Sequence, residues 1–214
     1  EFRRVLFRSH SVVPFCFCFL YTSMNVYDFD KTILKKDSSD AFFRYCLRRC
    51  PRTVIHPVMP KLQAFFRYAT GGAEKDAAPL KEELFAFLGS VGDPNRMVSA
   101  FWEENLSLVQ PWYLAQRRAD DLIISASPDF LVRPAAEWLG VFLIATPMDP
   151  FSGRITGLNC HDAEKLRRFR EEYPDSEIDE FYSDSLSDAP LASAARRAFL
   201  VKGNELTPWP LKGA

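Results

Sequence analysis

Short apolar runs alternate with longer amphipathic stretches along most of this chain. Runs rich in aliphatic and aromatic side chains predict five strands, at 25–28, 121–125, 141–145, 178–183 and 198–201. Helical periodicity in 128–139 and 163–172 separates the later strands. This alternation predicts a parallel sheet with helices on both faces, which is a three-layer α/β fold.

The stretch from 38 to 119 differs, because helical periodicity continues there without any strand signal. Helices are predicted at 39–49, 54–68, 79–88 and 94–109, with breaks at Pro51, Gly71-Gly72 and Pro94. Aromatic side chains recur near helical spacing: Phe42, Phe43, Phe65, Phe66, Phe85, Phe87, Phe101 and Trp102. We expect most of them in the core of a small helix bundle, and a few at a substrate pocket or a membrane-facing surface. The sequence therefore predicts an all-helical insertion, 38–119, within a core made of 24–37 and 120–214.

Residues 1–23 fit no element of this pattern. Three arginines precede an apolar stretch, as in a signal peptide, but no small-residue cleavage site follows and the stretch directly adjoins the first strand. The stretch is also too short, and too interrupted by Pro14, to span a membrane. We interpret 1–23 as a non-native leader before Met24. A targeting segment and an extra strand are the alternatives.

Charge and cysteine usage exclude some functions. The 191 residues from Met24 carry 24 Lys and Arg (27 less three in the leader) and 27 Asp and Glu (28 less one), a net charge of −3. This charge gives no electrostatic basis for a nucleic-acid partner. Outside the leader, Cys46, Cys50 and Cys160 are too scattered for a disulfide framework or a zinc site. A reducing cytoplasm is expected, and the sequence does not distinguish a monomer from a dimer.

The densest candidate chemistry follows the first predicted strand. Asp28 and Asp30 are separated by one residue, and Thr32 follows two positions later. Carboxylates this close repel each other and lose hydration, so they require a counter-cation or a chemical role. Nucleophilic catalysis on phosphorus provides that role: one Asp attacks, the other transfers the proton, and Mg²⁺ offsets the charge.

Other polar residues follow other strands. Ser125 ends one apolar run, and Asp184 ends another. In a parallel sheet, ligands bind outside the carboxyl ends of the strands. We therefore expect Asp28, Ser125 and Asp184 to converge on one crevice.

These residues resemble the four motifs of the haloacid dehalogenase-like hydrolases, in the family's order. Motif one is Asp28-x-Asp30-x-Thr32, and motif two is an apolar run ending at Ser125. Lys165 matches motif three, and Asp184 with Asp188 matches motif four. The resemblance implies a Rossmann-like core. A helical insertion at 38–119 is similar to the cap of the subgroup that includes phosphoserine phosphatase.

The resemblance implies a role for each motif residue. Asp28 would be the nucleophile and Asp30 the general acid and base, while Thr32 would hydrogen-bond within their phosphate-binding loop. The dehalogenase members lack the second acid, so Asp30 favours phosphoryl transfer.

The remaining motifs would bind the phosphoryl group and the metal ion. Ser125 and Lys165 would hold phosphate oxygens. Asp28, Asp30 and Asp184 would supply oxygen ligands to Mg²⁺, with Asp188 beside them orienting Lys165 or a metal-bound water.

Two departures from phosphoserine phosphatase concern the substrate. Ala126-Ser127 stands where that enzyme has Gly-Gly, so Ser127 is an alternative to Ser125. Asp37 stands where that enzyme has a Glu, and is expected to cap the first inserted helix rather than to meet a substrate. Asp37, Phe42 and Phe43 are the candidate substrate-pocket residues.

The sequence predicts a Mg²⁺-dependent phosphatase acting on a small-molecule phosphate monoester, with no membrane span. Phosphoserine phosphatase proper, a lipid-headgroup phosphatase, transfer to an acceptor other than water, and a catalytically idle binding module are the alternatives.

Overall fold

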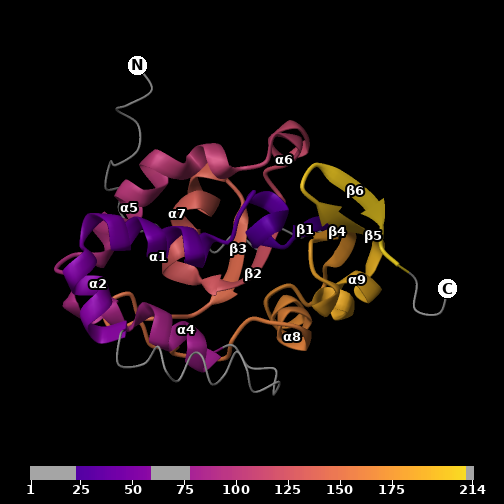
Figure 1. Ribbon diagram of the computed structural model, residues 1–214. Helices are drawn as coiled ribbons and strands as arrows, with labels where there is room; N and C mark the ends of the chain where they lie inside the picture. Colours follow the sequence, from indigo (N-terminus) through magenta and orange to yellow (C-terminus); the bar gives the residue numbers. More distant parts are fainter. Residues whose placement is uncertain (1–22, 59–77, 211–214) are drawn as a thin grey trace.

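A computed structural model describes residues 23–58 and 78–210. At its centre is one sheet with strand order β3-β2-β1-β4-β5-β6 (Figure 1). The strands are β1 (Ser23–Tyr27), β2 (Leu122–Pro128), β3 (Phe142–Thr146), β4 (Glu177–Ser183), β5 (Ala195–Lys202) and β6 (Glu205–Pro208). Strands β1 to β5 are mutually parallel, as predicted. The strand order reverses between β1 and β4, which is where sheets of this kind bind ligands.

The first and last strands along the chain differ slightly from the predictions. β1 begins at Ser23, which pairs with Glu177, one residue before the predicted core. Residues 1–22, the rest of the predicted leader, lie outside the described residues. β6 was not predicted and runs antiparallel to β5. All four of its side chains are exposed and it ends at Pro208, as suits an edge strand, so it carries no apolar pattern.

Alternating side chains of the central strands serve the two faces of the sheet. Val26 and Ile124 face the layer that contains α8 (Ala163–Glu172) and α9 (Ala189–Ala194). Tyr27 and Ile123 face the opposite layer, with α7 (Asp129–Leu139). The result is the predicted three-layer arrangement.

The helical insertion contains four principal helices among the described residues. They are α1 (Ser38–Arg49), α2 (Pro51–Val58), α4 (Ala78–Phe85) and α5 (Pro94–Asn105), and Figure 1 shows them gathered beside the sheet. Short 3₁₀ turns follow α4 (Ala86–Ser90) and α5 (Leu106–Leu108). α2 covers the predicted helix at 54–68 as far as Val58, and residues 59–68, with Phe65 and Phe66, lie outside the described residues.

A short helix near the end of the predicted insertion packs on the sheet itself. α6 (Pro111–Gln116) was not predicted. The ring of Tyr113 lies 4.8 Å from that of Tyr27, edge to face, and the ring of Trp112 lies 5.7 Å from that of Tyr182. This part of 38–119 is therefore joined to the core by aromatic contacts.

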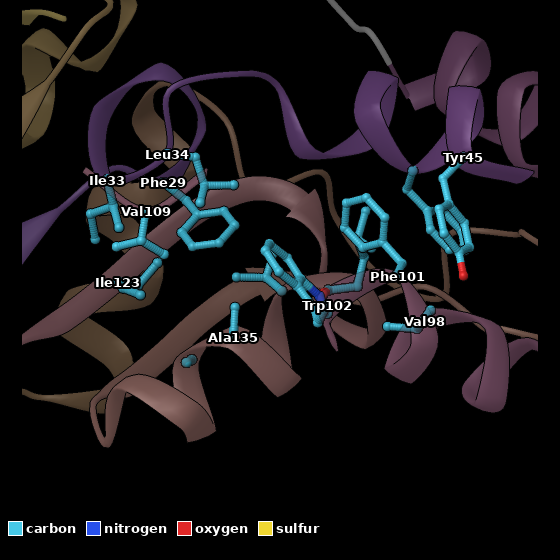
Figure 2. Packing of buried hydrophobic residues seen from close by; sticks show 14 of the residues in the cluster. Phe29, Ile33, Leu34, Tyr45, Val98, Phe101, Trp102, Val109, Ile123 and Ala135 are labelled. Atoms are coloured by element: carbon cyan, nitrogen blue, oxygen red, sulfur yellow. The ribbon is translucent and has the colours of Figure 1, made fainter. Parts of the chain in front are cut away.

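A row of aromatic rings joins the insertion to the start of the motif-one loop (Figure 2). Tyr45 contacts Phe101 at 5.5 Å, Phe101 contacts Trp102 at 4.9 Å, and Trp102 contacts Phe29 at 6.1 Å. The Trp102 indole N–H also donates to the Leu131 carbonyl at 2.7 Å. The insertion and the sheet therefore share one hydrophobic core on this face. Within residues 23–58 and 78–210, no helix combines the length and apolar character needed to cross a bilayer.

Candidate active site

Asp28 stands where β1 ends and a tight turn begins. Its backbone N–H still donates to the Tyr182 carbonyl of β4 at 2.8 Å, so the sheet holds it. The chain then turns over Phe29–Ile33 and closes with a bond from the Leu34 N–H to the Phe29 carbonyl at 2.9 Å. Lys31 takes a left-handed backbone conformation, with φ 56°. Such strain in a residue other than glycine is typical of functional loops.

Lys165 joins Asp28 to Asp188 in the buried interior of the site. Its Nζ lies 2.6 Å from Asp28 Oδ1 and 2.8 Å from Asp188 Oδ2. Asp188 Oδ2 also accepts a bond from the Ser183 hydroxyl at 2.7 Å. Burial alone would lower the pKa of Lys165, but the two carboxylates outweigh it and raise the pKa, so the ammonium stays charged. Asp188 is thus placed to orient Lys165, one of the two roles expected for it.

Thr32 links the loop after β1 to the loop after β4. Its hydroxyl donates to Asp28 Oδ2 at 3.3 Å and accepts from the Asp184 N–H at 2.9 Å. Burial raises the pKa of both Asp28 and Asp184. The Lys165 ammonium opposes the rise at Asp28, and the ammonium groups of Lys31 and then Lys165 oppose it at Asp184. Thr32 therefore links the Asp28 carboxylate to the backbone of Asp184, two residues that belong to different motifs.

Asp30 is held by two donors that the sequence analysis did not assign to it. The Ser38 N–H donates to Oδ1 at 2.7 Å, and the Ser127 hydroxyl donates to Oδ2 at 2.5 Å. Burial and the neighbouring Asp37 carboxylate raise the pKa of Asp30 to about 6, against the effect of these hydrogen bonds. A carboxyl with its pKa near neutrality suits both proton donation and proton removal.

Ser125 and Ser127 have different partners. Ser127 Oγ is engaged with Asp30, and it also lies 3.2 Å from the hydroxyls of Ser38 and Ser39. Ser125 Oγ accepts the Ser127 N–H at 3.0 Å and lines the cavity described below. Ser125 is therefore the one of the two serines that lines the cavity, whereas Ser127 supports Asp30.

These residues surround one open cavity of about 260 Å³ at the carboxyl ends of the strands. It is lined by Asp28, Asp30, Lys31, Asp37, Ser125, Ala126, His161, Lys165, Asp184, Ser185, Ser187 and Asp188. The expected convergence of Asp28, Ser125 and Asp184 is therefore present. Lys31 and His161 were not predicted to line the site. Lys31 lies inside motif one and His161 lies four residues before Lys165, so both positions could have drawn attention to them.

The candidate substrate-pocket residues divide into two groups. Asp37 lines the cavity, and its carboxylate caps α1 by accepting the Asp40 N–H at 2.9 Å, as expected. Phe42 and Phe43 are not among the cavity-lining residues. Phe42 is fully buried and its ring lies 5.4 Å from that of Phe101, edge to face, inside the insertion. The ring of Phe43 lies 6.0 Å from that of Phe87, so both phenylalanines pack within the insertion and neither lines this cavity.

The donor chemistry of the cavity suits a hydrated hard cation. Burial has raised the pKa of three of its carboxyls, Asp28, Asp30 and Asp184, and Lys165 contributes one buried positive charge among them. Within the described ranges, no three His, Cys, Asp or Glu side chains form a cage for a metal. Mg²⁺ is usually held by one or two carboxylates and several waters, so these residues fit such an ion without a cage.

Comparison with known proteins agrees with this arrangement. The family model of the haloacid dehalogenase-like hydrolases matches residues 26–193. Protein CicA from Caulobacter vibrioides is 31% identical over 185 residues, which cover 79% of this chain and 81% of that protein. A protein with unknown function from Bordetella pertussis Tohama I has a TM-score of 0.64 at 23% identity, covering 83% of this chain and 89% of its own. A probable phosphoserine phosphatase from Vibrio cholerae has a TM-score of 0.56 at 12% identity, covering 82% and 55% respectively.

The fold and the cavity define a Rossmann-like α/β protein with a carboxylate-rich site at the strand ends. Within that class, the chain belongs to the haloacid dehalogenase-like hydrolase family. The predicted family and fold class are confirmed. At their low sequence identities, the two solved structures bear on the fold alone.

Proposed function

We propose that this protein is a Mg²⁺-dependent phosphatase that hydrolyses a small phosphate monoester through an aspartyl-phosphate on Asp28. The observation that carries the proposal is the contact between Asp28 Oδ1 and Lys165 Nζ at 2.6 Å, on a cavity that Asp30 also lines. A nucleophile, a fixed cation and a second acid are the groups that phosphoryl transfer to a carboxylate requires.

Each residue has a distinct task in this reaction. Asp28 attacks phosphorus, and the bond to the leaving oxygen breaks as that oxygen takes the proton of Asp30. Lys165 and the Ser125 hydroxyl stabilise the charge on the phosphoryl oxygens. Asp30, now ionised, removes a proton from water, which attacks phosphorus and releases phosphate from Asp28.

The proposed metal site uses Asp28, Asp184 and the backbone carbonyl of Asp30. When bound there, Mg²⁺ would supply positive charge for the phosphoryl oxygens and balance the carboxylates. Asp188 would stay on Lys165, because its Oδ2 already accepts from Lys165 and Ser183.

We propose that other residues of the same cavity select the substrate. The buried groups meet only the phosphoryl group, which all candidate substrates share. Lys31, Asp37 and His161 line the same cavity beside them and are proposed to face the leaving group. Because the Asp37 carboxylate is engaged as a helix cap, an amino-group contact like that of phosphoserine phosphatase is not favoured.

The unpaired Cys46, Cys50 and Cys160 support a reducing cytoplasm.

A panel of phosphate monoesters tests the proposal. Hydrolysis should require Mg²⁺, stop with EDTA, resume when Mg²⁺ is restored, and be absent in Asp28→Asn. Acid quenching during turnover of a substrate that is labelled in its phosphoryl group should leave one labelled phosphoryl group per protein, on Asp28. Turnover that persists in Asp28→Asn would exclude the covalent route.

A further inference from the structure

A lysine of the helical insertion reaches the strand end that carries Ser125. Lys81, on α4, is half-buried, and its Nζ lies 2.6 Å from the Ala126 carbonyl and 2.6 Å from Asn159 Oδ1. Burial lowers the pKa of Lys81 to about 8, although the carboxylates of Asp30 and Asp37 oppose the shift. A desolvated ammonium is costly unless its hydrogen bonds are made, so this contact defines the position of the carbonyl.

The Ala126 carbonyl is held from two sides. The Thr146 hydroxyl, at the end of β3, donates to the same oxygen at 2.8 Å. Thr146 Oγ1 in turn accepts the Cys160 N–H at 2.9 Å, which keeps it in place. Lys81 and Thr146 together therefore fix this oxygen from the insertion and from the sheet.

The other edge of the same peptide unit meets Ser125. A trans peptide is planar, and its C=O and N–H point in opposite directions. The carbonyl of Ala126 faces Lys81, and the N–H of the same unit, which belongs to Ser127, donates to Ser125 Oγ at 3.0 Å. A hydroxyl has one hydrogen to donate. Once Ser125 Oγ has accepted the Ser127 N–H, its own hydrogen is available to the cavity that Ser125 lines.

We propose that Lys81 is a positioning residue through which the helical insertion sets the orientation of the Ser125 hydroxyl. The effect passes from Lys81 through the plane of one peptide, without contact between Lys81 and the phosphoryl group. The inference rests on the proposed function, because it assigns Ser125 to phosphate binding. It also explains how the site keeps a defined loop with Ala126-Ser127 where phosphoserine phosphatase has two glycines.

The neighbouring residue provides a matched control. Glu82, on the same helix, accepts the Ile155 N–H at 2.9 Å and so docks α4 on the loop after β3 without touching the Ala126 peptide. Glu82→Ala weakens the docking of α4 and leaves the Lys81 contact in place. A comparison of the two variants separates positioning of Ser125 from general attachment of the helix.

The test is a double-mutant cycle between Lys81→Met and Ser125→Ala, with p-nitrophenyl phosphate and several alkyl phosphates as substrates. Lys81→Met should lower kcat/KM on the order of tenfold, as for one lost charge-assisted hydrogen bond. The fold-loss in kcat/KM should be the same for every ester. In the Ser125→Ala background, Lys81→Met should cause no further loss, because the two residues act as a unit. Lys81→Arg should restore part of the activity, and Glu82→Ala should keep wild-type kcat/KM. If Lys81→Met does not fold, Lys81→Gln takes its place.

Several results would overturn the inference. A loss of the same size in the Ser125→Ala background would mean that Lys81 acts elsewhere. A factor that changes with the leaving group would make Lys81 a substrate contact. An equal loss in Glu82→Ala would reduce Lys81 to a docking residue.

The same double-mutant cycle can be measured without turnover, as the affinity for inorganic phosphate determined by calorimetry. Wild-type protein that binds phosphate but hydrolyses nothing would contradict the proposed function while the binding cycle still decides on Lys81. Protein that does neither would refute both proposals.

Discussion

The replacement Lys165→Met tests the electrostatic design of the site most directly. The side chain keeps most of its apolar stem and loses the one ammonium that contacts both Asp28 and Asp188. Lys165 and Asp188 are each 2% exposed, so water cannot replace the lost charge. We expect the variant to fold with reduced stability when it is metal-free, and to lack phosphatase activity when Mg²⁺ is present.

The loss in the free energy of unfolding can be calculated from two independent arguments. Removing one partner of a buried ion pair costs ~3–5 kcal/mol. A stranded carboxylate can instead take up a proton, at ~1.4 kcal/mol per pH unit above an unfolded-state pKa of ~3.9, which is about 5 kcal/mol at pH 7.5. The two values agree, and either is a large part of the 5–15 kcal/mol that is typical of a domain.

The pH dependence of the loss has a definite sign. In the variant, the folded state holds a proton that the unfolded chain has released, so the folded state binds more protons. Its stability relative to wild type therefore falls as pH rises, and the penalty shrinks to about 1.5 kcal/mol at pH 5. Urea unfolding followed by circular dichroism, in EDTA across this range, measures both quantities.

Two further variants control the experiment. Arg167, on the same helix, is exposed and forms ion pairs with Glu164 and Glu171, so Arg167→Met should change stability little. Adding Asp28→Asn to Lys165→Met removes one stranded charge and should recover part of the stability without recovering activity. If the penalty of Lys165→Met is independent of pH and unchanged by Asp28→Asn, buried charge is not its cause and the reasoning is refuted.

Three other predictions concern single residues. Beryllofluoride, a mimic of the aspartyl-phosphate, should raise the melting temperature of the wild type but not of Asp28→Asn; equal protection would contradict a covalent intermediate. Burial raises the pKa of Asp121 to about 6, so its ionisation costs stability as pH rises from about 4 through 6. In urea unfolding, Asp121→Asn should therefore gain up to about 3 kcal/mol relative to wild type between pH 4 and pH 8, and a constant difference would refute this. Ser127→Ala should lower turnover of alkyl phosphates more than of aryl phosphates, because poor leaving groups depend on protonation by Asp30; an equal loss would separate Ser127 from that step.

Most of the core could be read from local pattern. Each of the five parallel strands lies within three residues of its predicted bounds, and α8 matches its prediction at both ends. β6 and α6 were missed for opposite reasons. β6 is polar because it is an exposed edge, while Trp112 and Tyr113 of α6 are apolar residues in a segment too short to show helical periodicity.

Which residues form the site could be predicted from the sequence better than which of them contact each other. Ser127 and Asp30 are separated by 97 residues, and Lys81 and Ala126 by 45. Hydroxyl and ammonium groups have several possible acceptors, and only the packing of α1 and α4 on the sheet selects among them. The same packing decides that Phe42 lies against Phe101 and not at the cavity.

By itself, the sequence determined the α/β core and the chemistry at its strand ends. Apolar runs form the strands, and a parallel sheet brings the residues that follow them, among them Asp28, Ser125 and Asp184, to one edge. Only the tertiary structure decided how the charges are paired and which donors hold Asp30 and the Ala126 carbonyl. The physical reason is that periodicity encodes burial along one segment, whereas the partner of a polar atom depends on where distant segments pack.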